Sequence, residues 1–202
     1  AASLFPNAAV KRMDLDTTRG KHAFGDLIRA VENGEVDILV GTQMVTKGLD
    51  FDRVGLVGIM SADNLLSFHD FRANERAFQL IEQVAGRTGR RTSKGKVVIQ
   101  AMKPRHSIIQ LALNHDFTGM QAKELSVRQE YQYPPFVRLI TITLKHRDQK
   151  LLQRAAGEFA RSLHSKIGDR FLGPEFAPIA RLKNLYQMQI IVKVDKGSIG
   201  AK

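Results

Sequence analysis

Residues 36–50 read VDILVGTQMVTKGLD and indicate the fold of the first part of the chain. The apolar opening at 36–40 is typical of a buried strand in a parallel sheet. The loop after it is rich in threonine and glycine, and we expect it at the carboxyl edge of the sheet, where α/β proteins bind ligands. Such polar loops are also common without any function, so the stretch alone leaves its role open.

The residues on both sides of this stretch continue an alternation of strands and helices. Short apolar runs predict the strands, and apolar residues with a helical period predict the helices. This alternation indicates an α/β fold with a parallel sheet. We expect that fold over residues 1–117, with further strands at 9–13, 54–60 and 96–101 and helices at 21–33, 70–85 and 106–115.

The second part of the chain has a different pattern. Tyr133-Pro134-Pro135 ends a polar helix, because proline does not continue one. A turn is expected at Lys183-Asn184. We expect a helix, a strand, an amphipathic helix and two strands at 118–132, 138–145, 150–167, 171–180 and 186–194. This order predicts a small α+β domain at 135–202 after a helical linker at 118–134.

Two of these helices are expected to bury an apolar face. Apolar residues three, four or seven positions apart lie on one side of a helix. The two faces comprise Phe71, Phe78, Ile81 and Ala85 in the first helix, and Leu151, Leu152, Ala155, Phe159 and Leu163 in the second.

The formal net charge of +11 is the most informative compositional feature. Residues 1–115 hold 16 Lys and Arg against 12 Asp and Glu, and residues 116–202 hold 15 against 8, so the net charges are +4 and +7. This excess favours nucleic acid over a membrane as partner. The lack of cysteine suits a cytoplasmic protein. The six histidines show no metal-ligand spacing, so we expect no metal site.

A second informative stretch, QVAGRTGR, occupies residues 83–90. Glycines lower helix stability, so Gly86 and Gly89 indicate a need for exposed backbone. Arg87 and Arg90 lie three residues apart and project on nearby faces of one helical turn. Guanidinium groups suit the oxygens of a γ-phosphate. The alternative is a solvated basic run, because further basic residues follow.

Polar residues after two predicted strands are candidate DNA ligands, since small donors and a positive charge suit a phosphate backbone. The residues of this kind are Thr17, Thr18, Thr42, Gln43 and Lys47. Thr17 and Thr18 serve equally well as caps of the following helix. Gly48 permits close approach of another backbone. Asp50 can accept a hydrogen bond from a ribose hydroxyl or orient an arginine.

With both stretches in place, the chain resembles the PriA family of bacterial replication-restart helicases. Many helicases share the QVAGRTGR motif, whereas its combination with RMDLDTT (12–18) and YPPFVRL (133–139) is far more specific. The likeness covers nearly the whole chain. Further matching segments are LFP (4–6), DFRA (70–73), LGP (172–174), API (177–179) and RLKN (181–184).

The resemblance implies a RecA-like second helicase lobe followed by the family's C-terminal domain. By this carry-over, Arg90 is an arginine finger and Arg87 is its companion. The residues that grip DNA are Thr42, Gln43 and Lys47, and those that couple it to nucleotide are Gly48, Asp50, Gln83, Gly86 and Gly89.

The resemblance also implies partners and cofactors. The family couples ATP hydrolysis to 3′-to-5′ unwinding, recognises branched DNA at stalled forks, and binds the single-strand-binding protein and other primosome proteins in the bacterial nucleoid. ATP and Mg²⁺ are expected mainly in a first lobe that this sequence lacks. The family's zinc ligands are absent too, because the chain has no cysteine. We therefore expect part of a larger protein, inactive when isolated.

The alternative hypothesis is a catalytically silent module that binds DNA or a protein partner. The net charge of +7 favours a binding role for the C-terminal domain under either hypothesis. Tyr186 can stack on a base, although core packing is its more ordinary role. The candidate polyanion-facing residues of this domain are Arg138, Lys145, Arg181, Lys183 and Tyr186.

Overall fold

The computed structural model describes residues 3–14, 23–42, 54–68, 70–86 and 95–197. The chain forms two compact units. The first comprises Ala1–Phe68 and Arg72–Phe117, and the second comprises His69–Phe71 and Thr118–Lys202. Each unit has sheets of its own.

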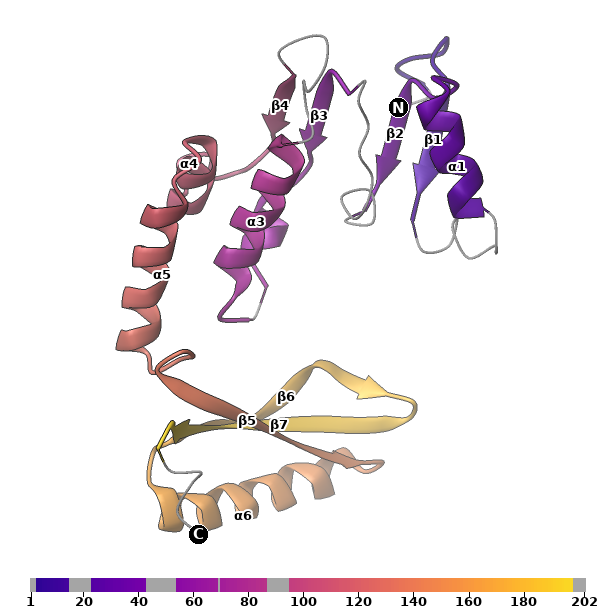
Figure 1. The fold of residues 1–202 in the computed structure, drawn as a ribbon. Coiled ribbons are helices and arrows are strands. Elements are labelled where there is room, and N and C mark those ends of the chain that lie inside the picture. The colour runs from indigo at the N-terminus through magenta and orange to yellow at the C-terminus, as the bar shows by residue number, and fades with distance from the viewer. Residues whose placement is uncertain (1–2, 15–22, 43–53, 69, 87–94, 198–202) are drawn as a thin grey trace. The chain divides into compact units, whose positions relative to one another are not determined.

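Two parallel strands and a helix open the first unit (Figure 1). β1 (Val10–Met13) pairs in parallel with β2 (Ile38–Gly41), and α1 (Ala23–Glu32) connects them in the chain. Gly34 has a φ of 77° and follows the helix at its predicted end, since glycine tolerates this left-handed conformation. The predicted strand–helix–strand order is therefore confirmed.

A second parallel pair consists of β3 (Leu56–Ile59) and β4 (Lys96–Ile99). Within the described ranges, the four strands of the first unit form two separate two-stranded sheets. The parallel direction that the alternation predicts is confirmed.

Three helices accompany the second pair: α2 (Asp63–Leu66), α3 (Ala73–Ala85) and α4 (Ser107–Leu113). The expected inner face of α3 is confirmed at Phe78 and Ile81, which are buried. Phe71 precedes the helix and belongs to the other unit, and Ala85 is only half-buried. The other buried side chains of α3 and α4 are Ala73, Ala77, Val84, Ile108, Ile109 and Ala112.

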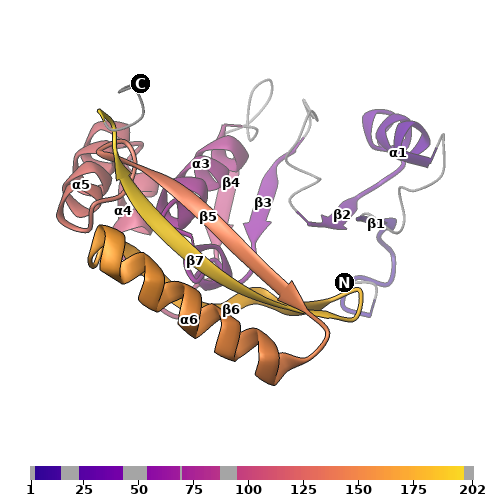
Figure 2. The ribbon, with the colours of Figure 1, turned by 90° about the horizontal axis from the view of Figure 1, so that it is seen from below.

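The second unit is a three-stranded antiparallel sheet with a long helix along one face (Figure 2). The strand order is β5-β7-β6, so the last strand of the chain lies in the centre. The predicted β-α-β-β order is confirmed. The elements after the first unit are α5 (Phe117–Glu130), β5 (Val137–His146), α6 (Gln149–Ile167), β6 (Phe171–Leu182) and β7 (Leu185–Asp195).

The face that α6 turns to the sheet differs in part from the expected one, in which the burial of Leu152 is confirmed. Leu151 and Phe159 are 40% and 37% exposed, so their predicted burial is wrong. Ala155 is exposed as well, and Leu163 is half-buried. A stripe of small residues faces the sheet because alanine lets the helix backbone come close. The buried side chains of α6 are Leu152, Ala156 and Ala160.

Residues with a positive φ shape the backbone of the β6–β7 hairpin at its turn and at Gly173. Lys183 and Asn184 form the predicted turn with φ values of 47° and 66°, which suits a tight two-residue hairpin. Gly173 has a φ of 98°, and a Cβ there would lie 2.6 Å from the backbone oxygen of Gln189. Only glycine fits at this position.

Candidate nucleic-acid interface

The ends of β1 and β2 lie side by side at one edge of their sheet. Met13 is opposite Gly41 in the parallel register, and the Thr42 N–H donates to the Met13 carbonyl across 3.4 Å. Asp14 is only 8% exposed, and its carboxylate pairs with Arg12. The segments that follow β1 and β2 therefore both leave the sheet at this same edge.

This edge is where both predicted DNA-gripping segments begin. Thr42 is exposed at the end of β2. Thr17 and Thr18 follow β1 closely in the sequence, and Gln43 follows Thr42 directly. Parallel pairing thus brings the starts of two polar segments together. The other candidates of these segments lie outside the described residues, and they are Thr17, Thr18, Gln43, Lys47, Gly48 and Asp50.

The end of α3 carries the first residues of the QVAGRTGR motif. Gln83 is exposed in the last turn, and Gly86 is the C-terminal cap, whose N–H bonds to the Glu82 carbonyl across 2.9 Å. Gly86 has a right-handed φ of −66°, so its conformation does not itself require glycine. Arg87, Gly89 and Arg90 lie outside the described residues.

A side-chain hydrogen bond joins the last turn of α3 to the residues just after α4. The two carboxylate oxygens of Glu82 lie 2.9 and 3.0 Å from Nδ1 of His115. His115 has a left-handed φ of 53° just after α4. The contact lies at the helix end from which the arginine motif continues. The sequence predicts only an ordinary histidine at 115, because nothing local signals a partner 33 residues away.

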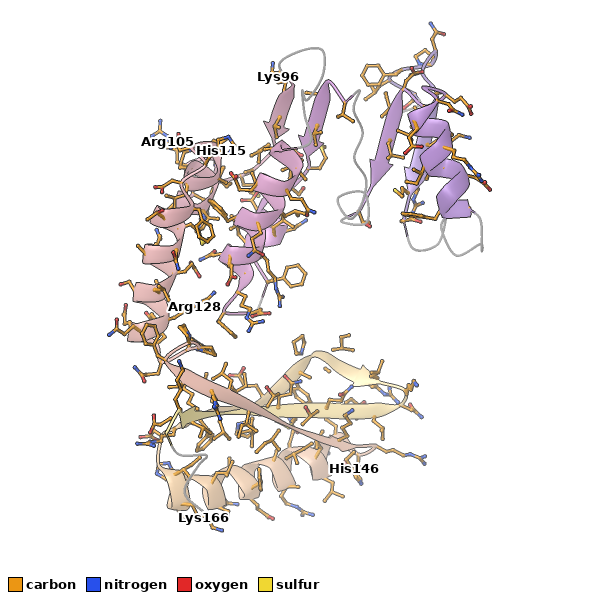
Figure 3. The ribbon with its side chains drawn as sticks, viewed as in Figure 1. Lys96, Arg105, His115, Arg128, His146 and Lys166 are labelled. Carbon is orange, nitrogen blue, oxygen red and sulfur yellow. The ribbon has the colours of Figure 1, made fainter. Side chains whose placement is uncertain are left out.

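Basic residues gather where the β6–β7 hairpin turns. Tyr186 of β7 pairs with Arg181 on one side and with His146 of β5 on the other, so the end of β5 lies beside the turn. Figure 3 shows His146 at this end of the sheet. We call the exposed residues gathered here the hairpin-end cluster, and they are Lys145, His146, Arg147, Arg181 and Lys183.

The side chains of this cluster do not share one face. Lys145 pairs with Gln187, one position from Tyr186, and successive side chains of a strand point to opposite faces. The Arg181 guanidinium lies 5.0 Å from the centroid of the Tyr186 ring and also bonds to Asn184. The Tyr186 ring packs against the α6 core as well. Tyr186 therefore has the more ordinary of its two expected roles, packing against the core.

Arg138 lies apart from the other candidates of this domain. It pairs with Val194 at the start of β5, whereas Lys145 lies near the end of that strand. Seven residues of antiparallel strand span roughly 23 Å. The five basic and aromatic candidates therefore do not form a single patch: four lie at the hairpin end, and Arg138 lies at the opposite end of the sheet.

Membrane spans and metal sites are both absent from the described part of the chain. None of its helices combines the length and apolar character needed to cross a bilayer. In the same ranges, no three His, Asp or Glu side chains gather in a way that would hold a metal ion.

Two family models match the chain. The helicase conserved C-terminal domain matches residues 7–92, and the primosomal protein N C-terminal domain matches residues 129–202. The first match identifies a RecA-like second helicase lobe, and the second identifies the small domain that follows it. The predicted fold class is therefore confirmed.

Curated proteins named Replication restart protein PriA are similar to most of the chain. The relative from Bacillus subtilis is 43% identical over 192 residues, which are 94% of this chain and 24% of the relative. Relatives from Synechocystis and Treponema pallidum are 42% and 37% identical over 193 residues, with 23% and 29% of the relatives and 94% and 95% of this chain covered. The chain thus spans about a quarter of the length of these relatives.

Proposed function

This chain belongs to the PriA family of replication restart proteins, and from that premise we propose that it supplies the second motor lobe and the C-terminal domain of an ATP-dependent DNA helicase. The shared edge of β1 and β2 carries this proposal. Segments with Thr17, Thr18, Thr42, Gln43 and Lys47 start there. Polar loops from adjacent parallel strands are well placed to hold one phosphate backbone.

Arg90 is the arginine finger of this proposal, and Arg87 is its companion. ATP and Mg²⁺ are held mainly by the first lobe, which supplies the phosphate-cradling loop. The Arg90 guanidinium offsets negative charge that develops on the transferred phosphoryl group, and such a finger is worth about 10³–10⁵ in rate. The residues that couple this step to DNA are Gly48, Asp50, Gln83, Gly86 and Gly89.

The accessible end of α3 supports this assignment. The motif continues from the last turn of this helix, where Glu82 contacts His115. Exposed Gln83 and Gly86 leave that helix end accessible.

The DNA substrate is branched DNA at stalled forks, which is unwound in the 3′-to-5′ direction. Basic residues of the hairpin-end cluster, with Lys183 at its turn, are the principal phosphate contacts of the C-terminal domain, and Arg138 is a separate contact. The family relation supports the single-strand-binding protein and other primosome proteins as partners. Zinc takes no part in this proposal, because the sequence contains none of the cysteines that would hold it.

Substitution of Arg90 in the full-length protein tests this function. Arg90→Ala is expected to lower DNA-stimulated ATP turnover about 10³-fold or more. Affinity for forked DNA should stay within about twofold of wild type, because the finger acts on nucleotide rather than on DNA. Arg91→Ala is the matched control and should retain turnover.

Full turnover in Arg90→Ala would contradict the finger assignment. The isolated chain should hydrolyse no ATP. ATP hydrolysis by the isolated chain that Arg90→Ala abolishes would contradict the need for a first lobe.

A catalytically silent binding module is the second candidate function. The net charge of +7 after residue 115 and the hairpin-end cluster favour it. Wild-type turnover in the full-length protein separates the two candidates, since only the helicase requires it. A salt titration tests binding by the chain itself: each phosphate contact contributes about −0.9 to the slope of log affinity against log salt, so a slope near zero removes the binding role.

A further inference from the structure

Phe71 lies in a stack of four side chains in the second unit. Its ring stacks on that of Tyr133, with centroids 5.3 Å apart and planes inclined by 8°. The guanidinium carbon of Arg128 lies 5.2 Å from the Phe71 centroid, and the Lys193 ammonium lies 4.9 Å from the Tyr133 centroid. Cations are attracted to aromatic faces, so these four residues, the Phe71 stack, hold one another in place.

Three members of the stack are fixed to the frame of the second unit by further bonds. The Tyr133 N–H donates to the Arg128 carbonyl across 2.7 Å, and the Lys193 ammonium donates to the Tyr131 carbonyl across 2.7 Å. Arg128 also lies 3.9 Å from the Glu124 carboxylate, and the two side chains are only 13% and 8% exposed. Figure 3 shows Arg128 at the end of α5, where this frame begins. The seat of the Phe71 ring consists of Arg128, Tyr133 and Lys193, and each of these residues has a contact within the second unit that does not involve Phe71.

Phe71 reaches this seat from a distant part of the sequence. Residues on both sides of its segment belong to the first unit, and the next residue, Arg72, is the N-terminal cap of α3. α3 has 13 residues and is about 20 Å long. Its other end leads into Arg87 and Arg90. The stack thus contains the residue directly before the N-terminal cap of α3, and α3 leads to the arginine motif.

We infer that Phe71 is a positioning residue that couples DNA binding by the C-terminal domain to the setting of the arginine motif. A displacement of the seat moves the Phe71 ring and, through Arg72, the start of α3. A hydrogen-bonded helix carries such a displacement to its far end as a rigid element. The inference deepens the proposed function and rests on it, since it needs both the finger and DNA binding by this domain.

The alternative role for Phe71 is that of an anchor that only stabilises the fold, and it leads to different expected results. Loss of an anchor lowers stability, and it lowers ATP turnover with and without DNA by the same factor. Loss of a coupling residue leaves turnover without DNA and the affinity for DNA in place, but it lowers the stimulation of turnover by DNA. The ratio of turnover with DNA to turnover without it separates the two roles.

The experiment uses the full-length protein and a forked DNA. Phe71→Leu keeps an apolar side chain but removes the stack, and Phe71→Tyr keeps the ring. Phe68→Leu is the matched control, because Phe68 lies three residues earlier and is 60% exposed. Phe71→Leu is expected to lower DNA stimulation by about fivefold or more while fork affinity and basal turnover stay within about twofold. Phe71→Tyr and Phe68→Leu should keep full stimulation.

Full stimulation in Phe71→Leu would overturn the inference, and so would an equal loss of basal and stimulated turnover. Tyr133→Leu removes the other ring of the stack and must reproduce the Phe71→Leu result, which keeps the test decisive if one variant folds poorly. A wild-type protein without DNA-stimulated turnover would overturn the proposed function and this inference together. Loss of turnover in Arg90→Ala with full stimulation in Phe71→Leu would overturn this inference alone.

Discussion

The Gly86 N–H donates to the Glu82 carbonyl across 2.9 Å, and a Cβ on Gly86 would lie 3.4 Å from the same oxygen. That distance is ordinary van der Waals contact. The right-handed φ of −66° also suits any L-residue. Neither local space nor local conformation therefore requires the glycine in the motif, and we predict that close approach by another group is its reason.

Gly86→Ala is therefore expected to separate stability from function. The free energy of unfolding of the chain should change by less than about 0.5 kcal/mol. ATP turnover by the full-length protein should fall, because the added methyl group obstructs a close approach to the helix end. Gly25→Ala in α1, where a Cβ meets nothing within 4 Å, is the control and should keep turnover. Unchanged turnover in Gly86→Ala would refute the prediction that Gly86 permits a close approach needed for turnover.

Gly173→Ala should destabilise the second unit strongly. Its φ of 98° is strained for alanine, and the new Cβ would clash with the Gln189 backbone. We expect a loss of about 2–4 kcal/mol, measured by urea unfolding. Gly157→Ala is the matched control in α6, where nothing lies within 4 Å of the added Cβ. The control should stabilise the chain by up to about 1 kcal/mol, because alanine is the better helix former.

Lys183→Asn should weaken DNA binding without disturbing the hairpin. Asparagine tolerates the left-handed conformation that Lys183 adopts with a φ of 47°, so the turn persists while the charge is lost. The salt slope of fork-DNA binding should become shallower by about 0.9 if Lys183 contacts one phosphate. Lys166→Gln, in the last turn of α6, is the control and should keep the wild-type slope. An unchanged slope in Lys183→Asn would remove this residue from the interface.

Asp148 should contribute stability that depends on pH. The hydrogen bond from the Leu151 N–H at the start of α6 is the main cause that lowers the pKa of Asp148 below its ordinary 3.8. A carboxyl with a lowered pKa stabilises the fold above its ordinary value, and this contribution is lost as the pH falls through the lowered pKa. Asp148→Asn keeps an acceptor but does not titrate. Urea unfolding at about pH 5 and about pH 2 should show a smaller acid loss in the variant than in wild type.

α6 illustrates how far periodicity alone can predict a buried face. Leu151, Ala155 and Phe159 form one helical stripe, and Leu152, Ala156 and Ala160 form the neighbouring one. Both stripes are apolar, so the sequence predicts an amphipathic helix but does not say which stripe meets the sheet. The structure buries the stripe with two alanines, because small side chains permit the closer approach.

The candidate site, too, could be predicted only in part from the sequence. The residues of the two motifs are enough to predict a helicase lobe, and the family matches confirm that lobe. The roles of Arg87 and Arg90 stay predictions, since both residues lie outside the described ranges. The His115 partner of Glu82 had no local signal, because it belongs to a different helix end.

By itself, the sequence determined the kind and order of most strands and helices, the turn at Lys183-Asn184, the basic charge and the helicase motifs. Each of these depends on residues a few positions apart. Only the tertiary structure placed Met13 beside Gly41, seated the Phe71 ring on Tyr133, and set Arg138 at the opposite end of the sheet from Lys183. These pairings join distant residues, and they depend on chain closure and on the packing of whole elements, which no local pattern encodes.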